Sequence, residues 1–490
     1  MAPSSSDGGD LSRHRAAGAA RAETWHGRFR AGRHSWIEAV HQDELLVLRH
    51  VCVEAHQIHF FHNASAAELF NKLREPYRAW QSVDPGRHVP PEWRFSTVVH
   101  DEPMTVHDNL LRTARWVRET SFLWVPHKAS PHNLYHFLNN LFLPLWRNAI
   151  LSASEHLPKR LFLFKLWPLD LSGMLNKLQP KQWPHNMTMS AFFSVLQKLF
   201  LEVAWPVEDL WADGRAICFD RFVWSQQLRT TRFPYQASTP QEWRYRDLNV
   251  SISARDAIRH ALQVEPPSPR ASSSDRPSVV WISRQSSCTP SRDPMKGIGR
   301  CVRNMGDVVD FLRRTKLFAT VRVIDRFELH EDASARDAQL REQLELLKTA
   351  DILIGVHGAG LGHIAYLERR SAVVELLDQF WFQRHYHNRS RLRQSAVLAD
   401  AAVQGTMYSA MARVQGCGYV AADLRLSNFT TRGYVLDATH MQRLGQIALA
   451  AWKKTQLVAH DACCQNHKVP RPIRCICQAK NSPLNVVIPL

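Results

Sequence analysis

The pattern of apolar and polar residues changes about halfway along the 490-residue chain. In the second half, short runs that are apolar throughout alternate with longer amphipathic segments, which predicts strands and helices in turn. Strands that are apolar on both faces and alternate with helices predict a parallel sheet covered on both sides, and so a doubly wound α/β domain. The expected strands cover 279–283, 319–324, 351–356 and 372–377, and the expected helices cover 304–314, 334–348, 361–367 and 442–452.

The first half predicts a second folded region with a less regular alternation. Apolar runs at 45–53, 57–61 and 120–125 predict strands, and apolar residues at helical spacing predict helices at 65–74 and 134–146. Between the halves, 264–278 is dense in Pro and Ser, a composition that does not pack and behaves as a linker.

These patterns divide the chain into five stretches. We expect a disordered basic arm over 1–43, an N-terminal domain over 44–263, the linker over 264–278, a C-terminal Rossmann-like domain over 279–440, and a C-terminal helix with a Cys-rich tail over 441–490. The arm is rich in Ala, Gly, Ser and Arg and lacks the apolar run of a secretory signal. No stretch of the sequence approaches the ~18 consecutive apolar residues that a membrane-spanning helix needs.

Composition narrows the class of protein. Hydrophobic residues make up 45% of the chain, which excludes wholesale disorder, collagen and coiled coil. Lys and Arg exceed Asp and Glu by 62 − 45 = 17 charges, which suggests either an anionic partner or simply a basic surface. Basic and aromatic residues do not interleave as a nucleic-acid platform requires, so we expect no nucleic-acid partner.

The cysteines and the glycosylation sequons favour an oxidising compartment for this protein. The nine cysteines are an odd number, so at least one is unpaired if the others form disulfides. Four of them lie in the tail beside His467, at a spacing that fits no common zinc finger, so we expect disulfides there and no metal site. Five Asn-x-Ser/Thr sequons, each weak evidence alone, stand at Asn63, Asn186, Asn249, Asn388 and Asn428.

The sharpest motif for chemistry is the run His357-Gly358-Ala359-Gly360-Leu361, which follows the expected strand 351–356 directly. Glycines let a backbone approach a ligand closely, and the N-terminus of the following helix offers N–H groups and a positive dipole end to an anion. The run is neither a dinucleotide-binding G-x-G-x-x-G nor a Walker A loop. The alternative is a tight strand-to-helix turn that binds nothing.

Residues at two further strand ends could contact a ligand bound at the glycine turn. Arg284 and Gln285 follow the strand 279–283, and Arg is suited to two phosphate oxygens at once, although a solvated loop arginine is the alternative. Glu375 lies near the end of the strand 372–377, where a lone carboxylate is costly unless paired. At the crevice it could accept hydrogen bonds from a ribose.

In the first half, His136 stands near the start of the expected helix 134–146. A histidine near its ordinary pKa at such a place is a credible general base. A buried core histidine is the alternative.

Several of these segments together resemble glycosyltransferase family 61. The segments are Ser130 to Trp146 with its His-Phe-Leu helix, Trp281 to Gln285, Arg300 to Leu312, Gly355 to Leu361, and Val373 to Leu376. Their order and approximate spacing match over about residues 45 to 455. The family includes plant xylan-decorating xylosyl- and arabinosyltransferases and animal protein O-linked N-acetylglucosaminyltransferases.

The resemblance implies a GT-B fold of two Rossmann-like domains facing across a cleft, with the acceptor on the N-terminal domain (44–263) and the nucleotide sugar on the C-terminal domain (279–440). It also implies inverting transfer from a UDP-sugar to a glycan or glycoprotein. It implies that His357 and the Gly358-Ala359-Gly360 backbone, with Arg284, hold the diphosphate, that Glu375 holds the ribose, and that His136 is the base. No Asp-x-Asp triplet occurs, which favours catalysis without a metal or another cofactor.

Asn139 and Asn140 stand where many members of that family carry an acidic residue. This departure supports the alternative of a non-catalytic nucleotide- or glycan-binding relative. The resemblance also implies residence in the Golgi or endoplasmic reticulum lumen, with any membrane association made through an anchor not visible in this sequence.

Overall fold

A computed structural model describes part of the chain. The described residues are 35–41, 45–54, 57–72, 96–100, 110–125, 138, 142–152, 160–163, 195–200, 202–204, 214–226, 248–267, 276–288, 301–325, 333–377, 407–424, 428–430, 433–458 and 487–489. No helix among them is both long enough and apolar enough to cross a bilayer.

The chain forms two compact units. The first comprises Met1–Lys128, Arg147–Leu169 and Phe200–Arg229, and the second comprises Ala129–Trp146, Asp170–Leu199 and Thr230–Leu490.

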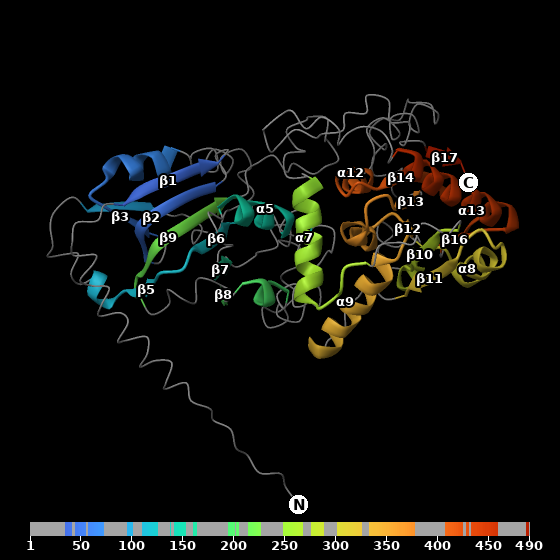
Figure 1. Ribbon diagram of the computed structural model, residues 1–490, viewed down its shortest axis with the longest axis horizontal. Coiled ribbons are helices and arrows are strands. Elements are labelled where there is room, and N and C mark those ends of the chain that lie inside the picture. Colours follow the sequence, from blue (N-terminus) through green and yellow to red (C-terminus); the bar gives the residue numbers. More distant parts are fainter. Residues whose placement is uncertain are drawn as a thin grey trace, which may run out of the picture. The chain divides into compact units, whose positions relative to one another are not determined.

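The first unit is built on a nine-stranded mixed sheet (Figure 1). Its main path runs β4-β3-β2-β9-β6-β7-β8, with β1 paired to β2 and β5 paired to β9. The run β9-β6-β7-β8 is parallel, whereas β2 pairs antiparallel with β1, β3 and β9. The strands are β1 (Trp36–His41), β2 (Leu45–Glu54), β3 (Gln57–Phe61), β4 (Ser96–His100), β5 (Arg115–Val117), β6 (Ser121–Val125), β7 (Arg160–Leu163), β8 (Glu202–Ala204) and β9 (Ile217–Gln226).

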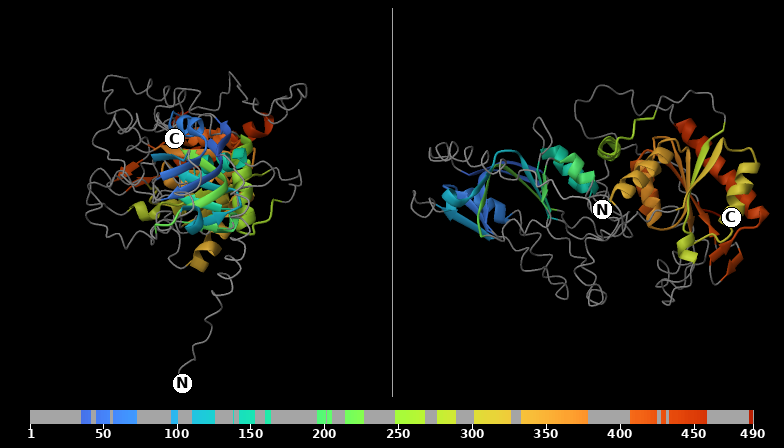
Figure 2. Two further views of the ribbon diagram at one scale, coloured as in Figure 1. Left: turned by 90° about the vertical axis from the view of Figure 1, so that its left-hand side faces the viewer. Right: turned by 90° about the horizontal axis from the view of Figure 1, so that it is seen from below.

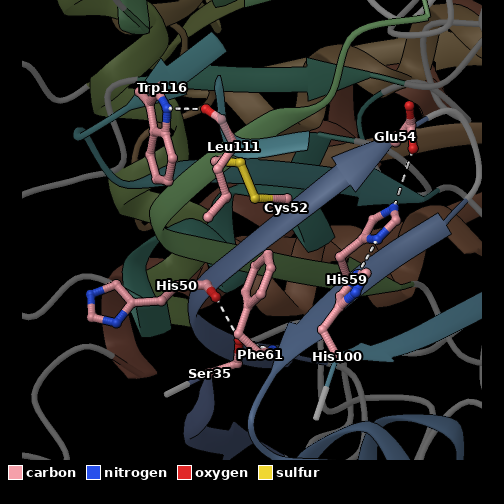
Figure 3. Close-up of a disulfide and its surroundings, with 10 residues drawn as sticks. Ser35, His50, Cys52, Glu54, His59, Phe61, His100, Leu111 and Trp116 are labelled. Atoms are coloured by element: carbon pink, nitrogen blue, oxygen red, sulfur yellow. Dashed lines mark hydrogen bonds and ion pairs between the residues drawn. A yellow bond between two sulfur atoms is a disulfide. The ribbon is translucent and has the colours of Figure 1, made fainter. Parts of the chain in front are cut away.

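Strands β2 and β9 form the centre of this unit because their side chains are buried on both faces. Cys52 and Cys218 lie opposite each other in the register of the two strands and form a disulfide (Figure 3). Near the disulfide in the same view, His59 Nδ1 lies 2.8 Å from His100 Nε2.

The elements expected near the N-terminus are largely observed. The strands expected at 45–53, 57–61 and 120–125 correspond to β2, β3 and β6. Residues 64–72 are helical, and the Asn63 side chain accepts a hydrogen bond from the Ala66 N–H at the start of that helix. The prediction of a disordered arm over 1–43 is wrong for Trp36–His41, because β1 pairs along β2.

Within the expected helix 134–146, the described residues 138 and 142–146 are helical. The observed helix, α5, spans Leu143–Ser152, and most of the expected range lies outside the described residues.

The second unit contains a six-stranded sheet in the order β11-β10-β12-β13-β14-β17, and every neighbouring pair is parallel. This confirms the expected parallel α/β sheet. Its strands are β10 (Ser278–Ile282), β11 (Thr320–Ile324), β12 (Ile352–Val356), β13 (Ala372–Leu377), β14 (Gly418–Asp423) and β17 (Val487–Pro489). Its helices are α7 (Leu248–Ala261), η8 (Gln285–Cys288), α8 (Met305–Arg314), α9 (Ala333–Lys348), η9 (Ala359–Tyr366), α12 (Met407–Val414) and α13 (Ala438–Val458), and β15 (Asn428–Thr430) pairs with β16 (Gly433–Val435).

Helices cover both faces of this sheet. Helices α8 and α13 pack on one face (Figure 2, right). Their side chains Leu312 and Leu444 belong to the same buried apolar cluster as Ile354 and Val374 of the sheet. Helices α9 and α12 pack against η9, and α12 also contacts β14. Because side chains alternate along a strand, the set that includes Ile354 and Val374 faces α8 and α13, and the set that includes Gly355 and Glu375 points to the opposite face.

The strand order places the change of chain direction between β10 and β12. From β10 the chain passes to β11 on one side, and it then returns to β12 on the other side of β10. Numbered in chain order from β10, the six strands run 2-1-3-4-5-6, and the first five follow the doubly wound arrangement 2-1-3-4-5. Ligands of such folds bind at the carboxyl ends of the first and third strands, which are β10 and β12 here.

Helix α7 belongs to the second unit, although the sequence predicted an N-terminal domain up to residue 263. Arg255 Nη1 lies 3.0 Å from Glu368 Oε2, and Arg259 also pairs with Glu368. The two arginines are four residues apart, so one helix face presents both to the segment that follows η9. These ion pairs explain why α7 lies with the sheet that follows it in the sequence.

Candidate functional site

The candidate site lies where β10 and β12 end, at the carboxyl edge of the second unit's sheet. Arg284 follows β10 after one residue, and His357 and Gly358 follow β12 directly. Ile282 and Gly355 are partners in the parallel register, so the two chain segments leave the sheet side by side. The structure therefore brings together Arg284 and the His-Gly-Ala-Gly turn, which are 73 residues apart in the sequence.

Arg284 is bound to the backbone of the glycine turn. Its Nη1 donates a hydrogen bond to the carbonyl oxygen of His357 at 2.7 Å. Gly358 has φ +152°, a conformation that residues with a side chain rarely adopt, and a Cβ there would lie 1.6 Å from Arg284 Nη1. A glycine is thus required for two reasons: the backbone has a positive φ, and the guanidinium fills the space that a side chain would need.

Helix η9 begins at this turn. No side chain caps it at Gly358, and the Leu361 N–H donates to the Gly358 carbonyl at 2.9 Å. Peptide dipoles at such a helix start favour an anion.

Leu361 has a packing role, and its contact with the donor stays a prediction. Its side chain is fully buried, and a Cβ on Gly355 would lie 3.0 Å from its Cδ2. Leu361 thereby holds η9 close against β12.

The imidazole of His357 is bound to a buried carboxylate. Its Nδ1 lies 2.5 Å from Glu375 Oε1, and the other oxygen of Glu375, Oε2, accepts a hydrogen bond from the Tyr419 hydroxyl. The Tyr408 ring lies edge-on to the imidazole, with ring centroids 5.3 Å apart. His357 is 7% exposed and Glu375 is 0% exposed, so only the histidine of this pair reaches the protein surface.

This burial corrects the predicted role of Glu375. A carboxylate with no exposed surface, and with both oxygens bonded to protein groups, does not present an acceptor to a ribose hydroxyl. The sequence correctly indicated that a lone carboxylate in this strand needs a partner. The partners are His357 and Tyr419.

Gln285 is exposed and stabilises the chain that follows the site. Its Nε2 donates to the Val302 carbonyl at 2.9 Å, beside the disulfide between Cys288 and Cys301. Contact with the donor stays a prediction for Gln285. The observed role is to tie the end of β10 to the segment before α8.

Sequence reasoning missed His363, which is fully buried behind the glycine turn. Its Nδ1 lies 2.6 Å from the Gly360 carbonyl and its Nε2 lies 3.0 Å from Gln343 Oε1 on α9. Burial lowers the pKa of His363 to about 4, against the raising effect of the Gly360 carbonyl. A neutral ring carries one N–H, so it donates to the nearer oxygen, the Gly360 carbonyl, and its Nε2 lies against the Gln343 amide of α9. The proximity of His363 to the glycines, three residues after Gly360, was the signal that could have revealed it.

The α7 arginines were also missed. Arg259 Nη2 donates to the Tyr366 carbonyl at 2.7 Å and Arg255 Nη1 donates to the Leu367 carbonyl at 2.9 Å. Burial lowers the pKa of Arg259, although the hydrogen bond and charge of Glu368 oppose this effect. The sequence signal that could have revealed them is their spacing of four residues on an amphipathic helix, which places both on one helix face. These contacts fix the far end of η9, opposite the glycine turn.

Several expected participants lie outside the described residues. They include the candidate base His136, together with Asn139 and Asn140, and the four tail cysteines Cys463, Cys464, Cys475 and Cys477. Within the described ranges, no group of three or more His, Cys, Asp and Glu side chains is arranged to hold a metal ion.

Two comparisons with known proteins bear on this site. A family model described as Glycosyltransferase 61 matches residues 132–374, a range that includes Arg284 and the glycine turn and ends one residue before Glu375. A search of curated proteins found no match.

Proposed function

Because the chain belongs to glycosyltransferase family 61, we propose that it moves a sugar from a UDP-sugar to a hydroxyl group of a glycan or glycoprotein, with inversion at the sugar carbon. The proposal includes a GT-B arrangement, in which the second unit binds the nucleotide sugar and the first unit faces the acceptor. The mixed α/β architecture is compatible with such a fold.

The observation that carries this proposal is the meeting of Arg284 and the glycine turn at the β10/β12 edge. A guanidinium and a helix start without a side-chain cap meet there. Each of these groups favours a phosphate, and the topology puts them at the edge where doubly wound folds bind nucleotides. A strand-to-helix turn that bound nothing would not need an arginine packed where a Cβ would otherwise be.

The proposed chemistry divides between two sets of groups. As the bond between the sugar carbon and the phosphate oxygen breaks, its electron pair passes to the diphosphate, and the cationic edge of the second unit stabilises that charge. The acceptor oxygen forms the new bond to the sugar carbon and loses its proton to a general base, for which His136 is our candidate. The products are the glycosylated acceptor, UDP and the protonated base.

We further propose that this chemistry runs without a metal ion, since Arg284 and the helix start can neutralise the diphosphate in its place. The proposed compartment is the secretory lumen. The two disulfides of the described residues, Cys52–Cys218 and Cys288–Cys301, support that proposal because disulfides persist in oxidising compartments.

A nucleotide-sugar panel tests the proposed function directly. The full chain is incubated with UDP-xylose, UDP-arabinose, UDP-N-acetylglucosamine and a matched GDP-sugar, and release of the nucleoside diphosphate is measured with and without glycan acceptors. We expect release from at least one UDP-sugar and none from the GDP-sugar. UDP binding without turnover of any donor would instead identify a non-catalytic relative, and absence of both would refute the proposal.

A further inference from the structure

The two disulfides of the described residues differ in how accessible they are. Cys52 and Cys218 join the two central strands of the first unit, and both are 0% exposed. The second disulfide joins Cys288, the last residue of η8, to Cys301, which precedes α8. Cys301 is buried, but Cys288 is partly exposed. A thiol in solution can therefore attack the second disulfide at Cys288, whereas the first is enclosed by its sheet.

The lengths of the closed loops also separate the two disulfides. A disulfide stabilises a fold mainly by restricting the unfolded chain, and this effect grows with the length of the loop that it closes. Cys288 and Cys301 are 13 residues apart, whereas Cys52 and Cys218 are 166 residues apart. The second disulfide is therefore expected to contribute less to global stability than the first, and it acts four residues away from Arg284.

The segment that begins at Cys301 is held by β16. The Arg303 N–H donates to the Tyr434 carbonyl at 2.8 Å, and the Tyr434 N–H donates to the Cys301 carbonyl at 2.9 Å. The Asn304 side chain adds two hydrogen bonds to the backbone of Leu436, since Nδ2 donates to the carbonyl at 2.7 Å and Oδ1 accepts from the N–H at 3.0 Å. None of these four bonds involves sulfur, so the segment stays in place whether the disulfide is closed or open.

A glycine of β16 leaves space for the sulfur of Cys301. Gly433 has φ +136°, and a Cβ there would lie 2.6 Å from Cys301 Sγ and 2.8 Å from the Cys301 carbonyl oxygen. A residue with a side chain at this position would have to displace the sulfur or the backbone. The disulfide therefore bonds Cys288 to a point that is packed tightly against β16.

Two links connect this segment to the residues that follow Arg284. One is the disulfide at Cys288, and the other is the hydrogen bond of 2.9 Å from Gln285 Nε2 to the Val302 carbonyl. They lie at the last and first residues of η8. Arg284 directly precedes η8, and its guanidinium donates to the His357 carbonyl. The short helix that follows Arg284 is therefore held at both of its ends.

We infer that the Cys288–Cys301 disulfide is a redox-sensitive positioning element of the donor site, which holds Arg284 where the diphosphate binds. This inference rests on the proposed function. With the disulfide closed, η8 is fixed at both ends and Arg284 is preorganised against the glycine turn. With the disulfide open, only the hydrogen bond of the two links remains, and η8 occupies more positions. The fraction of molecules with Arg284 in place then falls, and UDP affinity falls by the same factor.

Opening the disulfide takes two electrons and two protons from a dithiol reductant. One thiolate of the reductant attacks the exposed sulfur, Cys288 Sγ, and forms a mixed disulfide. The electron pair of the broken S–S bond passes to the sulfur of Cys301, which takes up a proton. The second thiol of the reductant then attacks its own sulfur in the mixed disulfide, so Cys288 leaves and also takes up a proton. The products are two cysteine thiols and the oxidised, cyclic reductant.

The first test is graded reduction of the full chain. Samples are treated with increasing dithiothreitol, free thiols are blocked with iodoacetamide, and both reagents are removed. Peptide mass spectrometry gives the reduced fraction of each disulfide, and calorimetry gives the dissociation constant and stoichiometry of UDP. We expect Cys288–Cys301 to open at a lower reductant concentration than Cys52–Cys218.

Opening Cys288–Cys301 should raise the dissociation constant of UDP about tenfold at unchanged stoichiometry, which corresponds to a competent fraction of about one tenth. In samples left without iodoacetamide, re-oxidation with glutathione disulfide should restore the parental affinity. A disulfide with only a structural role would instead lower the stoichiometry, because unfolded molecules bind no UDP.

The double variant Cys288→Ala with Cys301→Ala removes the link without adding an alkyl group. It should bind UDP about tenfold more weakly than the parent before any reductant is added. Dithiothreitol should change its affinity no further, and that result separates this disulfide from Cys417 and the tail cysteines. The matched control is Cys52→Ala with Cys218→Ala, which should lower the melting temperature and keep the parental UDP affinity. Graded reduction of the parent decides the question if a variant does not fold.

Parental UDP affinity with Cys288–Cys301 fully open would overturn the inference. A loss of affinity that follows reduction of Cys52–Cys218 would overturn it as well, and so would a loss of UDP stoichiometry in place of a change in the dissociation constant. Failure of the proposed function is separate, because it is seen in the oxidised parent as absence of both UDP binding and donor turnover.

Discussion

The guanidinium of Arg284 occupies the space that a side chain at Gly358 would need. A Cβ on Gly358 would lie 1.6 Å from Nη1 and 2.6 Å from Cζ of Arg284. Arg284 is the residue that we propose to hold the diphosphate, and Gly358 opens the turn. The position of each side chain therefore restricts which residue can stand at the other position. This relationship leads to a first prediction that does not depend on knowing the sugar or the acceptor.

We predict that Gly358→Ala abolishes UDP binding, because the new methyl group must displace the Arg284 guanidinium or distort a backbone at positive φ. The measurement is the shift in melting temperature on addition of UDP. Gly306→Ala on α8 is the control, since a Cβ there meets nothing within 4 Å. A parental UDP shift in Gly358→Ala would show that the turn tolerates a side chain and that Arg284 can bind elsewhere.

Arg284→Ala should remove most of the stabilisation by UDP, because the diphosphate then loses its cationic partner at the end of β10. The melting temperature with and without UDP reports this effect. Arg322→Ala removes an equal charge from an exposed position on β11 and should keep the full shift. An unchanged shift in Arg284→Ala would take Arg284 out of the phosphate site.

The candidate base is tested by His136→Ala. Turnover of the UDP-sugar to an acceptor should fall about a hundredfold, the lower range for loss of a general base, while UDP binding survives. His260→Ala, at an exposed position on α7, is the control for loss of a histidine. Equal turnover in His136→Ala and the parent would remove His136 from the mechanism.

The buried His363 predicts a loss of stability in mild acid. Its pKa is about 4 in the folded protein and near 6.5 when exposed, so below pH 6.5 the unfolded chain binds a proton that the folded chain excludes. Stability is therefore fully present above pH 6.5 and is lost progressively as the pH falls towards 4, by about 2 kcal/mol at pH 5. Melting temperatures at pH 8 and pH 5 should differ less in His363→Asn than in the parent. An identical difference in both proteins would show that His363 is protonated in the fold.

Dependence on metal is tested by chelation. EDTA should leave transfer from the UDP-sugar intact, because the proposed mechanism neutralises the diphosphate with Arg284 and the start of η9. The assay compares initial rates before and after EDTA treatment and dialysis, with a metal-dependent transferase as the positive control. Complete loss of activity that manganese restores would overturn the metal-free mechanism.

Local pattern predicted much of the second unit. The apolar runs at 279–283, 319–324, 351–356 and 372–377 correspond to β10, β11, β12 and β13 within a residue or two. These predictions succeed because a strand buried on both faces must be apolar throughout, whatever lies next to it. The expected helix at 361–367 is instead the 3₁₀ helix η9, which begins two residues earlier at Ala359.

Predictions that depended on distant neighbours were less accurate. Glu375 was assigned to a ribose because nothing in its own strand shows that Tyr419, 44 residues later, binds one oxygen. The packing role of Leu361 is likewise invisible in the sequence, because only the close approach of η9 to Gly355 reveals it. The position of α7 depends on ion pairs with Glu368, more than 100 residues further along the chain.

The amino-acid sequence by itself determined the parallel α/β character of the second half, the glycine turn after a buried strand, and the presence of an arginine after another. Each of these follows from interactions within a few residues. Only the tertiary structure decided that β10 and β12 are neighbours at the reversal of strand order, so that Arg284 meets the turn, and that a buried carboxylate and a tyrosine support His357. Those relationships join residues tens of positions apart, and the physical reason is that strand pairing and side-chain packing, which bring them together, leave no periodic trace in the sequence.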